Sequence, residues 1–288
     1  MTKLAKTVLA GSIGVAALSG VNHAQTPSQP VKHIVLVHGA FADGTSWGKV
    51  IPILEARGFH VVAVQNPLTS LADDANATRR LIAQMEGPVI LVGHSWGGAV
   101  ITEAGDDPKV AGLVYVAAWM PDIGTSANQT SEPFPPTPVL KEIKVDAQHF
   151  ASLSEDGVIN DFAQGLPMAE RRLVLVVQGQ TYGPMFDEKL THAAWKSKPS
   201  WHVISMNDRT LSPAMEEDQA KRSGGVVVKL STCHVAMLQE PEKVADVITE
   251  AAKGAAAKLK NSDGSGSLKD SRDSLGTSEV AAVGASAK

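Results

Sequence analysis

Five consecutive residues have the spacing of a serine nucleophile. Gly93-His94-Ser95-Trp96-Gly97 follows the apolar run Val89–Val92 and precedes the helix-like stretch Ala99–Ala104. A strand, a sharp turn and a helix around a G-x-S-x-G sequence push the serine oxygen out of the sheet, with the helix N-terminus beneath it. Side chains larger than glycine at positions 93 and 97 would collide with the neighbouring strand and helix. The pattern therefore predicts that Ser95 is a nucleophile, rather than a serine in an ordinary glycine-rich turn.

Such a nucleophile needs rigid elements to position it, and the surrounding sequence predicts them. Short apolar runs are continuous, as in strands buried on both faces; they occur at Ile34–Val37, Val61–Val64, Val89–Val92, Leu113–Ala117, His202–Met206 and Val226–Leu230. Helical patterns lie between most of them, at Trp47–Ala56, Thr69–Met85 and Glu242–Leu259. In the second helix, Asp73 and Asp74 lie near the start, where the helix dipole favours acidic residues. The alternation predicts an α/β fold with a mostly parallel central sheet flanked by helices.

This regularity is interrupted between Pro121 and about Lys198, a region with prolines at 133, 135, 136 and 138. An insertion of that size between two strands predicts a cap (about 121–198) over the carboxyl edge of the sheet, where open α/β sheets bind ligands. We expect the folded domain to span 31–258. Residues 1–24 have the basic start and apolar run of a signal peptide, which predicts export to the periplasm or secretion. Residues 261–288 are rich in Ser, Gly and Ala and predict a flexible tail.

The chain resembles α/β-hydrolases of the serine-esterase kind, in the branch with plant methylesterases, hydroxynitrile lyases and bacterial carboxylesterases. The resemblance rests on His38-Gly39-Ala40-Phe41, the 93–97 turn, Lys196–Trp201, Asp208-Arg209 and Ser231-Thr232-Cys233-His234, in unbroken order from about Val31 to Ala252. It implies the α/β-hydrolase fold with a cap insertion, and a Ser-His-Asp triad that hydrolyses carboxylic esters through an acyl-enzyme.

The resemblance also implies the partners of Ser95. Among nine histidines, His234 alone follows the last predicted strand and precedes the final helix, where this fold carries its general base. The acid that orients the imidazole is expected at Asp208, in the loop after His202–Met206. Asp122, after the preceding strand, is the rival acid, and Asp187 in the cap is a weaker one.

The oxyanion of the tetrahedral intermediate needs backbone N–H donors already in place. One is the N–H of Trp96, directly after the nucleophile, and the resemblance assigns the other to Ala40. Phe41 and Trp119 lie beside these loops and predict an apolar substrate pocket for small or aromatic esters, although both could equally be plain core residues. Cys233 lies outside any such turn and is expected to be an inert, packed thiol.

Composition limits the other possibilities. The formal charge of −4, from 26 basic and 30 acidic residues, argues against nucleic-acid binding, and the single cysteine excludes an intrachain disulfide. No apolar run reaches the length of a membrane span, no metal-ligand or dinucleotide motif is present, and no cofactor is expected. A small-molecule ester is the expected partner.

Related chemistries leave recognisable traces. Haloalkane dehalogenases and epoxide hydrolases use an aspartate at the position of Ser95. Hydroxynitrile lyases of the resembling branch carry a threonine and a lysine where this chain has Gly39 and Val235. A cofactor-free perhydrolase would use the same triad, and a ligand-binding protein of this fold could retain it, so both stay open as alternatives.

Overall fold

The six predicted strands form one parallel sheet in the computed structural model, which describes residues 30–266. The sheet has the order β2-β1-β3-β4-β8-β9. Its strands are β1 His33–Val37, β2 His60–Ala63, β3 Val89–Ser95, β4 Val110–Ala118, β8 Ser200–Ser205 and β9 Val226–Leu230. All five pairings are parallel, so the carboxyl ends of the strands meet at one edge. This confirms the predicted α/β architecture.

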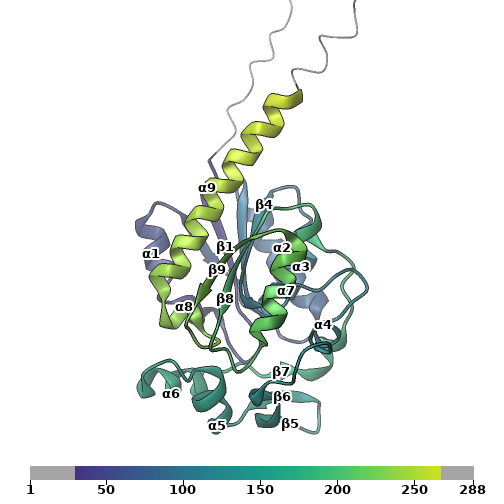
Figure 1. Ribbon diagram of the computed structural model, residues 1–288, viewed down its shortest axis with the longest axis vertical. Coiled ribbons are helices and arrows are strands. Elements are labelled where there is room, and N and C mark those ends of the chain that lie inside the picture. Colours follow the sequence, from purple (N-terminus) through teal and green to yellow (C-terminus); the bar gives the residue numbers. More distant parts are fainter. Residues whose placement is uncertain (1–29, 267–288) are drawn as a thin grey trace, which may run out of the picture.

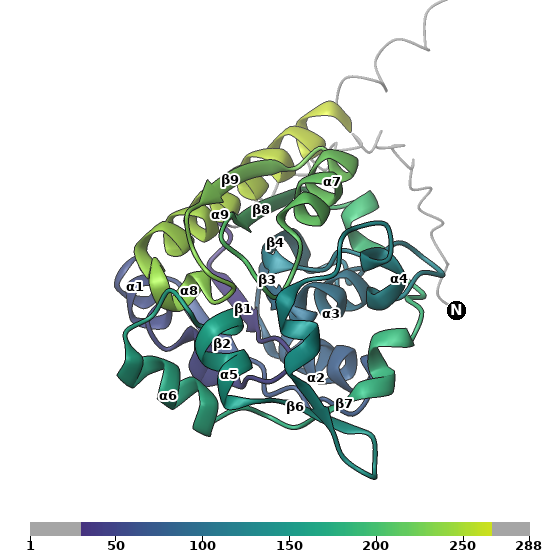
Figure 2. The ribbon, with the colours of Figure 1, turned by 60° about the horizontal axis from the view of Figure 1, so that its bottom comes forward.

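Helices cover both faces of the sheet (Figures 1 and 2). One face carries α1 Ile51–Ala56, α8 Ala236–Gln239 and α9 Pro241–Gly266, and the other carries α2 Leu71–Gln84, α3 Trp96–Ala104 and α7 Pro213–Ser223. The Ser70 side chain caps α2 by accepting from the backbone N–H of Asp73. The helix α7 was not among the predicted elements; it begins at a proline and ends at Gly224, whose φ of 63° suits the C-terminal position.

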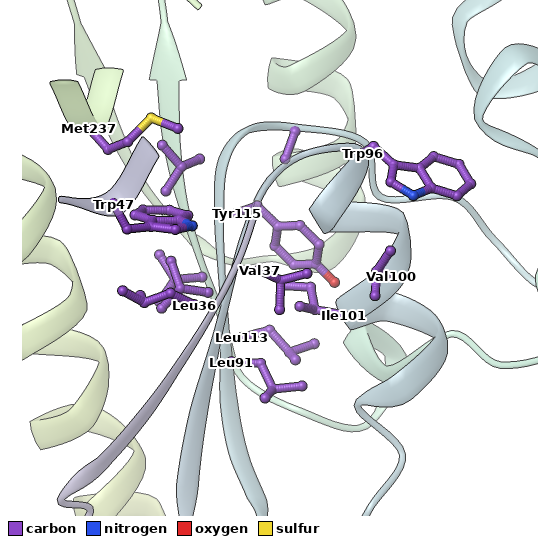
Figure 3. Packing of buried hydrophobic residues seen from close by; sticks show 14 of the residues in the cluster. Leu36, Val37, Trp47, Leu91, Trp96, Val100, Ile101, Leu113, Tyr115 and Met237 are labelled. Carbon is purple, nitrogen blue, oxygen red and sulfur yellow. The ribbon is translucent and has the colours of Figure 1, made fainter. Parts of the chain in front are cut away.

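The core lies on both sides of the central strands (Figure 3). Trp47 and Met237 pack on one side, and Trp96 and Ile101 pack on the other; all four side chains are fully buried. Strands β3 and β4 are buried along their whole length, as their continuous apolar runs predict. The same prediction is wrong for β2 and β9, which are partly exposed because they form the two edges of the sheet.

Most of the segment between β4 and β8, here called the cap (residues 121–198), lies below the sheet in Figure 1, while its last turn, Ala194–Lys196, packs against α3 beside the sheet. It contains a small antiparallel sheet of β5 Ile143–Val145, β6 Phe150–Leu153 and β7 Thr181–Tyr182, which the sequence did not predict. Its helical elements are α4 Ala127–Ser131, η2 Pro138–Glu142, α5 Glu155–Gly157, the π-helical turn η3 Val158–Phe162, α6 Met168–Val176, η4 Gly183–Asp187 and η5 Ala194–Lys196. A further 3₁₀ turn, η1 Gly44–Trp47, lies before the cap and follows β1.

The predicted signal peptide (1–24) lies outside the described residues, as do residues 267–288 of the predicted tail. Residues 261–266, which the sequence places in that tail, continue α9 beyond the expected end at Leu259. The alanine- and lysine-rich stretch before them favours helix, and a helix once formed extends at low cost. Within residues 30–266, no helix has the length and apolarity needed to cross a membrane.

Candidate active site

Ser95 lies at the junction of β3 and α3 in a conformation that an ordinary serine does not adopt. Its φ of 54° and ψ of −121° place it outside the regions of strand and helix. A Cβ at Gly93 would collide with the carbonyl oxygen of Gly97, and a Cβ at Gly97 with that of Val37 on β1. The predicted need for glycine on both sides of the serine is therefore confirmed.

His234 and Asp208 meet at the carboxyl edge of the sheet. His234 Nδ1 lies 2.7 Å from Asp208 Oδ2, and both side chains are fully buried. The other oxygen of Asp208 accepts from the backbone N–H groups of Thr210 (2.7 Å) and Leu211 (3.0 Å), which fixes the carboxylate. With Nδ1 donating to Asp208, the buried Nε2 of His234 has no partner within residues 30–266. This tautomer leaves an Nε2 lone pair that can take up a proton.

His94 holds His234 beside the turn that contains Ser95. His94 Nε2 donates to the backbone carbonyl of His234 (3.0 Å), and the two rings lie 4.6 Å apart between centroids. Burial, and next the proximity of His234, lower the pKa of His94 well below its ordinary value, so its ring is neutral. Phe162 of η3 packs against the His234 ring at 4.9 Å, in an edge-to-face arrangement.

The rival acids lie elsewhere. Asp122 pairs with Lys196 (2.6 Å) on a partly exposed surface, and Asp187 accepts from the side chain of Asn128 (2.8 Å). Of the three candidates, the structure brings Asp208 alone into contact with His234.

The loop after β1 lies against the nucleophile. A Cβ at Gly39 would come within 2.7 Å of the Ser95 Cβ, so the loop that continues to Ala40 and Phe41 passes next to the serine. Trp96 is the first residue of α3, and its N–H consequently has no partner inside the helix. Both ring nitrogens of His38 have partners: Nδ1 donates to the Gly39 carbonyl and Nε2 accepts from the Asn66 N–H, which indicates a structural role.

The two predicted pocket residues line different cavities. Phe41 lines a largely apolar cavity of about 320 Å³, together with His94, Phe162, Leu173, Val174 and Val235. Trp119 lines a second cavity of about 410 Å³, next to Thr210 and Leu211 of the acid loop. Phe186 of η4 lies between the two, 6.5 Å from the Phe41 ring and 5.7 Å from the Trp119 ring. The sequence gives no signal for Phe186, because the cap loop that carries it has no regular pattern.

Two acidic residues are buried near the site, and the sequence does not predict their burial. Asp74 lies near the start of α2, as the sequence indicates, but it is also buried and accepts from the indole of Trp96 (2.7 Å). Burial raises its pKa to about 6. Glu216 of α7 is buried near Asp208; burial, and then the charge of Asp208, raise its pKa well above the ordinary value. The thiol of Cys233 is also buried, and burial raises its pKa, as expected for an inert cysteine.

No group of three or more His, Cys, Asp or Glu side chains within residues 30–266 could hold a metal ion. The groups gathered at this edge of the sheet are a serine hydroxyl, an imidazole paired with a fixed carboxylate, and backbone N–H groups at the start of α3.

Comparisons with known proteins show the family and the fold of this chain. The family model described as "Alpha/beta hydrolase family" matches residues 34–247. A pyrethroid hydrolase of Sphingobium wenxiniae is 28% identical over 250 residues, which cover 76% of this chain and 87% of that protein. Methylesterase 8 of Arabidopsis thaliana is 27% identical over 203 residues, which cover 63% of this chain and 74% of that protein. The crystal structure of polyneuridine aldehyde esterase shares the fold, with a TM-score of 0.67 at 19% identity, covering 76% of this chain and 98% of that one.

Proposed function

The chain is a carboxylic ester hydrolase of the alpha/beta hydrolase family, and we propose that it works through an acyl-enzyme formed on Ser95. The observation that carries the proposal is the buried His234–Asp208 pair, held by His94 next to the strained serine. A serine hydroxyl is a weak nucleophile at neutral pH and needs such a base.

In the proposed reaction, Ser95 Oγ attacks the ester carbonyl carbon while His234 Nε2 takes up the hydroxyl proton. The backbone N–H groups of Ala40 and Trp96 donate to the oxyanion that forms. The C–O bond to the alcohol then breaks, and the leaving alkoxide receives the proton from His234. Water attacks the acyl-enzyme by the same route, releases the acid and restores Ser95. Asp208 keeps its charge throughout and stabilises the imidazolium.

The substrate we propose is an ester with one apolar arm. The apolar cavity of about 320 Å³ is lined by Phe41 and His94, which are chain neighbours of Ala40 and Ser95, and by Leu173 and Val174 of α6. Displacing water from such a surface favours an alkyl or aromatic group by about 25 cal/mol per Å² buried. We also propose export, on the strength of the signal-peptide pattern in residues 1–24.

Steady-state hydrolysis of p-nitrophenyl butyrate by the wild type and by Ser95→Ala tests the proposal. We expect the variant to lose turnover by about a thousandfold or more, since triad knockouts retain little catalysis. Ser200→Ala is the matched control, because Ser200 is also buried but bonds to Ser223 at the amino end of β8. Equal rates in wild type and Ser95→Ala would exclude Ser95 as the nucleophile.

A further inference from the structure

Two bulky residues beside the site have positive φ angles: Phe41 at 56° and Leu68 at 57°. Such residues hold this conformation only where the surrounding structure fixes it. Phe41 directly follows Ala40, whose N–H is a proposed oxyanion donor, so the 40–41 peptide is joined through a single Cα to the 39–40 peptide that carries this N–H. Both residues are buried, and specific hydrogen bonds fix each of them.

Phe41 is fixed by the cap. Its backbone N–H donates to Thr181 Oγ1 at 3.1 Å, a contact between residues 140 positions apart. Thr181 is fully buried in β7, the cap strand nearest the central sheet in Figure 1. Two residues before it, Gly179 approaches so closely that a Cβ there would come within 2.9 Å of the Ala42 carbonyl oxygen. The loop that carries Ala40 and Phe41, here called the oxyanion loop, therefore packs against residues 179–182.

Leu68 is fixed by the same strand and by Asp74. Its carbonyl accepts from the N–H of Tyr182 in β7 (2.8 Å), and its N–H donates to Asp74 Oδ1 (2.9 Å). The other oxygen of Asp74 accepts from the Trp96 indole (2.7 Å). The residue after the nucleophile is thus tied through Asp74 and Leu68 to β7, which also holds Phe41.

We propose that Thr181 and Asp74 are positioning residues for the oxyanion hole, and that β7 aligns its two backbone donors. This inference rests on the proposed serine mechanism, because it concerns the donors Ala40 and Trp96. Neither residue reaches the reacting atoms: Thr181 acts through the Phe41 peptide, and Asp74 through the Trp96 side chain. A misplaced donor reduces the stabilisation of the transition state more than it reduces the affinity for substrate. We therefore expect kcat to fall while KM changes little.

Thr181→Val tests the inference, since it removes the hydroxyl at nearly constant volume. Turnover of p-nitrophenyl butyrate is measured per active site, with the sites counted by end-point titration with a fluorophosphonate. Removing a whole oxyanion donor costs about 10²–10³ in kcat, so a misaligned donor is expected to cost about 10- to 100-fold, with KM within about twofold. A trifluoromethyl ketone, which forms an oxyanion on the serine, should bind weaker by about the same factor.

Thr181→Ser keeps the hydroxyl and is expected to retain kcat within about threefold of the wild type. Thr102→Val is the matched control: Thr102 is equally buried on α3, but its hydroxyl bonds to Tyr115 and to the Gly98 carbonyl. We expect this variant to lose stability and keep its turnover per active site. Asp74→Asn is the second variant, with the same expected fall in kcat, and it decides the question if Thr181→Val does not fold.

The outcomes separate the two proposals. The role of β7 would be overturned if Thr181→Val kept the wild-type kcat per active site, or if Thr181→Val and Thr181→Ser were impaired equally. An inactive Ser95→Ala would at the same time uphold the serine mechanism. An equal loss in Thr102→Val would show that any buried threonine has this effect, and would also overturn it. An active Ser95→Ala would overturn the proposed function itself.

Discussion

The ionisation of Asp74 gives this protein a stability term that changes with pH. Its side chain is fully buried in α2, and burial raises its pKa from the ordinary 3.8 to about 6, against the hydrogen bonds from Trp96 and Leu68. The neighbouring charges of Asp73 and Glu188 act in the same direction as burial. Because the folded pKa is raised, the stability contributed by the neutral carboxyl is complete below pH 3.8 and is lost as the pH rises through 6.

The size of this loss follows from the shift of about two pKa units at 1.36 kcal/mol each, or about 3 kcal/mol in total. Most of it, about 2 kcal/mol, falls between pH 4.5 and 7.5. Asp74→Asn cannot ionise and escapes the loss. Its free energy of unfolding, relative to the wild type, is therefore expected to rise by about 2 kcal/mol across that range, whatever constant penalty the substitution brings.

Urea unfolding of both proteins, followed by circular dichroism at pH 4.5, 6.0 and 7.5, measures this difference. Asp73→Asn is the control from the same helix, because hydrogen bonds from Ser70 and Thr69 lower the pKa of exposed Asp73. Its difference from the wild type should not rise with pH. If the difference in free energy of unfolding between Asp74→Asn and the wild type stays flat or falls between pH 4.5 and 7.5, the buried carboxyl ionises as freely as in water, and its pKa is not raised.

Two further substitutions test the geometry of the site. Asp208→Asn is expected to lower kcat for p-nitrophenyl butyrate by about 10³- to 10⁴-fold, because the amide disfavours the required His234 tautomer. Asp122→Asn should keep kcat within about twofold of the wild type. The reverse ranking would identify Asp122 as the acid. Gly39→Ala places a Cβ 2.7 Å from the Ser95 Cβ and is expected to cost about 100-fold in kcat by displacing the oxyanion loop, and wild-type turnover with an unchanged melting temperature would contradict this.

The sequence was most informative where function depends on neighbours in the chain. The turn around Ser95 depends on glycines two residues before and two residues after it. Asp208 and His234 lie in the loops that follow β8 and β9, which the sequence predicts as apolar runs. Parallel strands bring their carboxyl ends to one edge, so the sequence placed His234 near the acids that follow the neighbouring strands, and the structure shows that Asp208 rather than Asp122 contacts it.

The sequence was silent where contacts join distant segments. The bond from Phe41 to Thr181 spans 140 positions, and β7, which carries Thr181, has two residues and therefore no periodicity to detect. Asp74 has the sequence signature of a helix start, and only packing against α3 shows that it is buried under Trp96. The helix α7 is highly charged and has no clear apolar stripe, so its sequence does not predict a helix.

Labelling with a fluorophosphonate, followed by peptide mass spectrometry, shows whether Ser95 forms the covalent intermediate. We expect one adduct, on Ser95, formed rapidly in the wild type, much more slowly in His234→Ala and not at all in Ser95→Ala. An adduct on another residue, or steady ester turnover by a protein whose Ser95 remains unlabelled at saturating reagent, would contradict it.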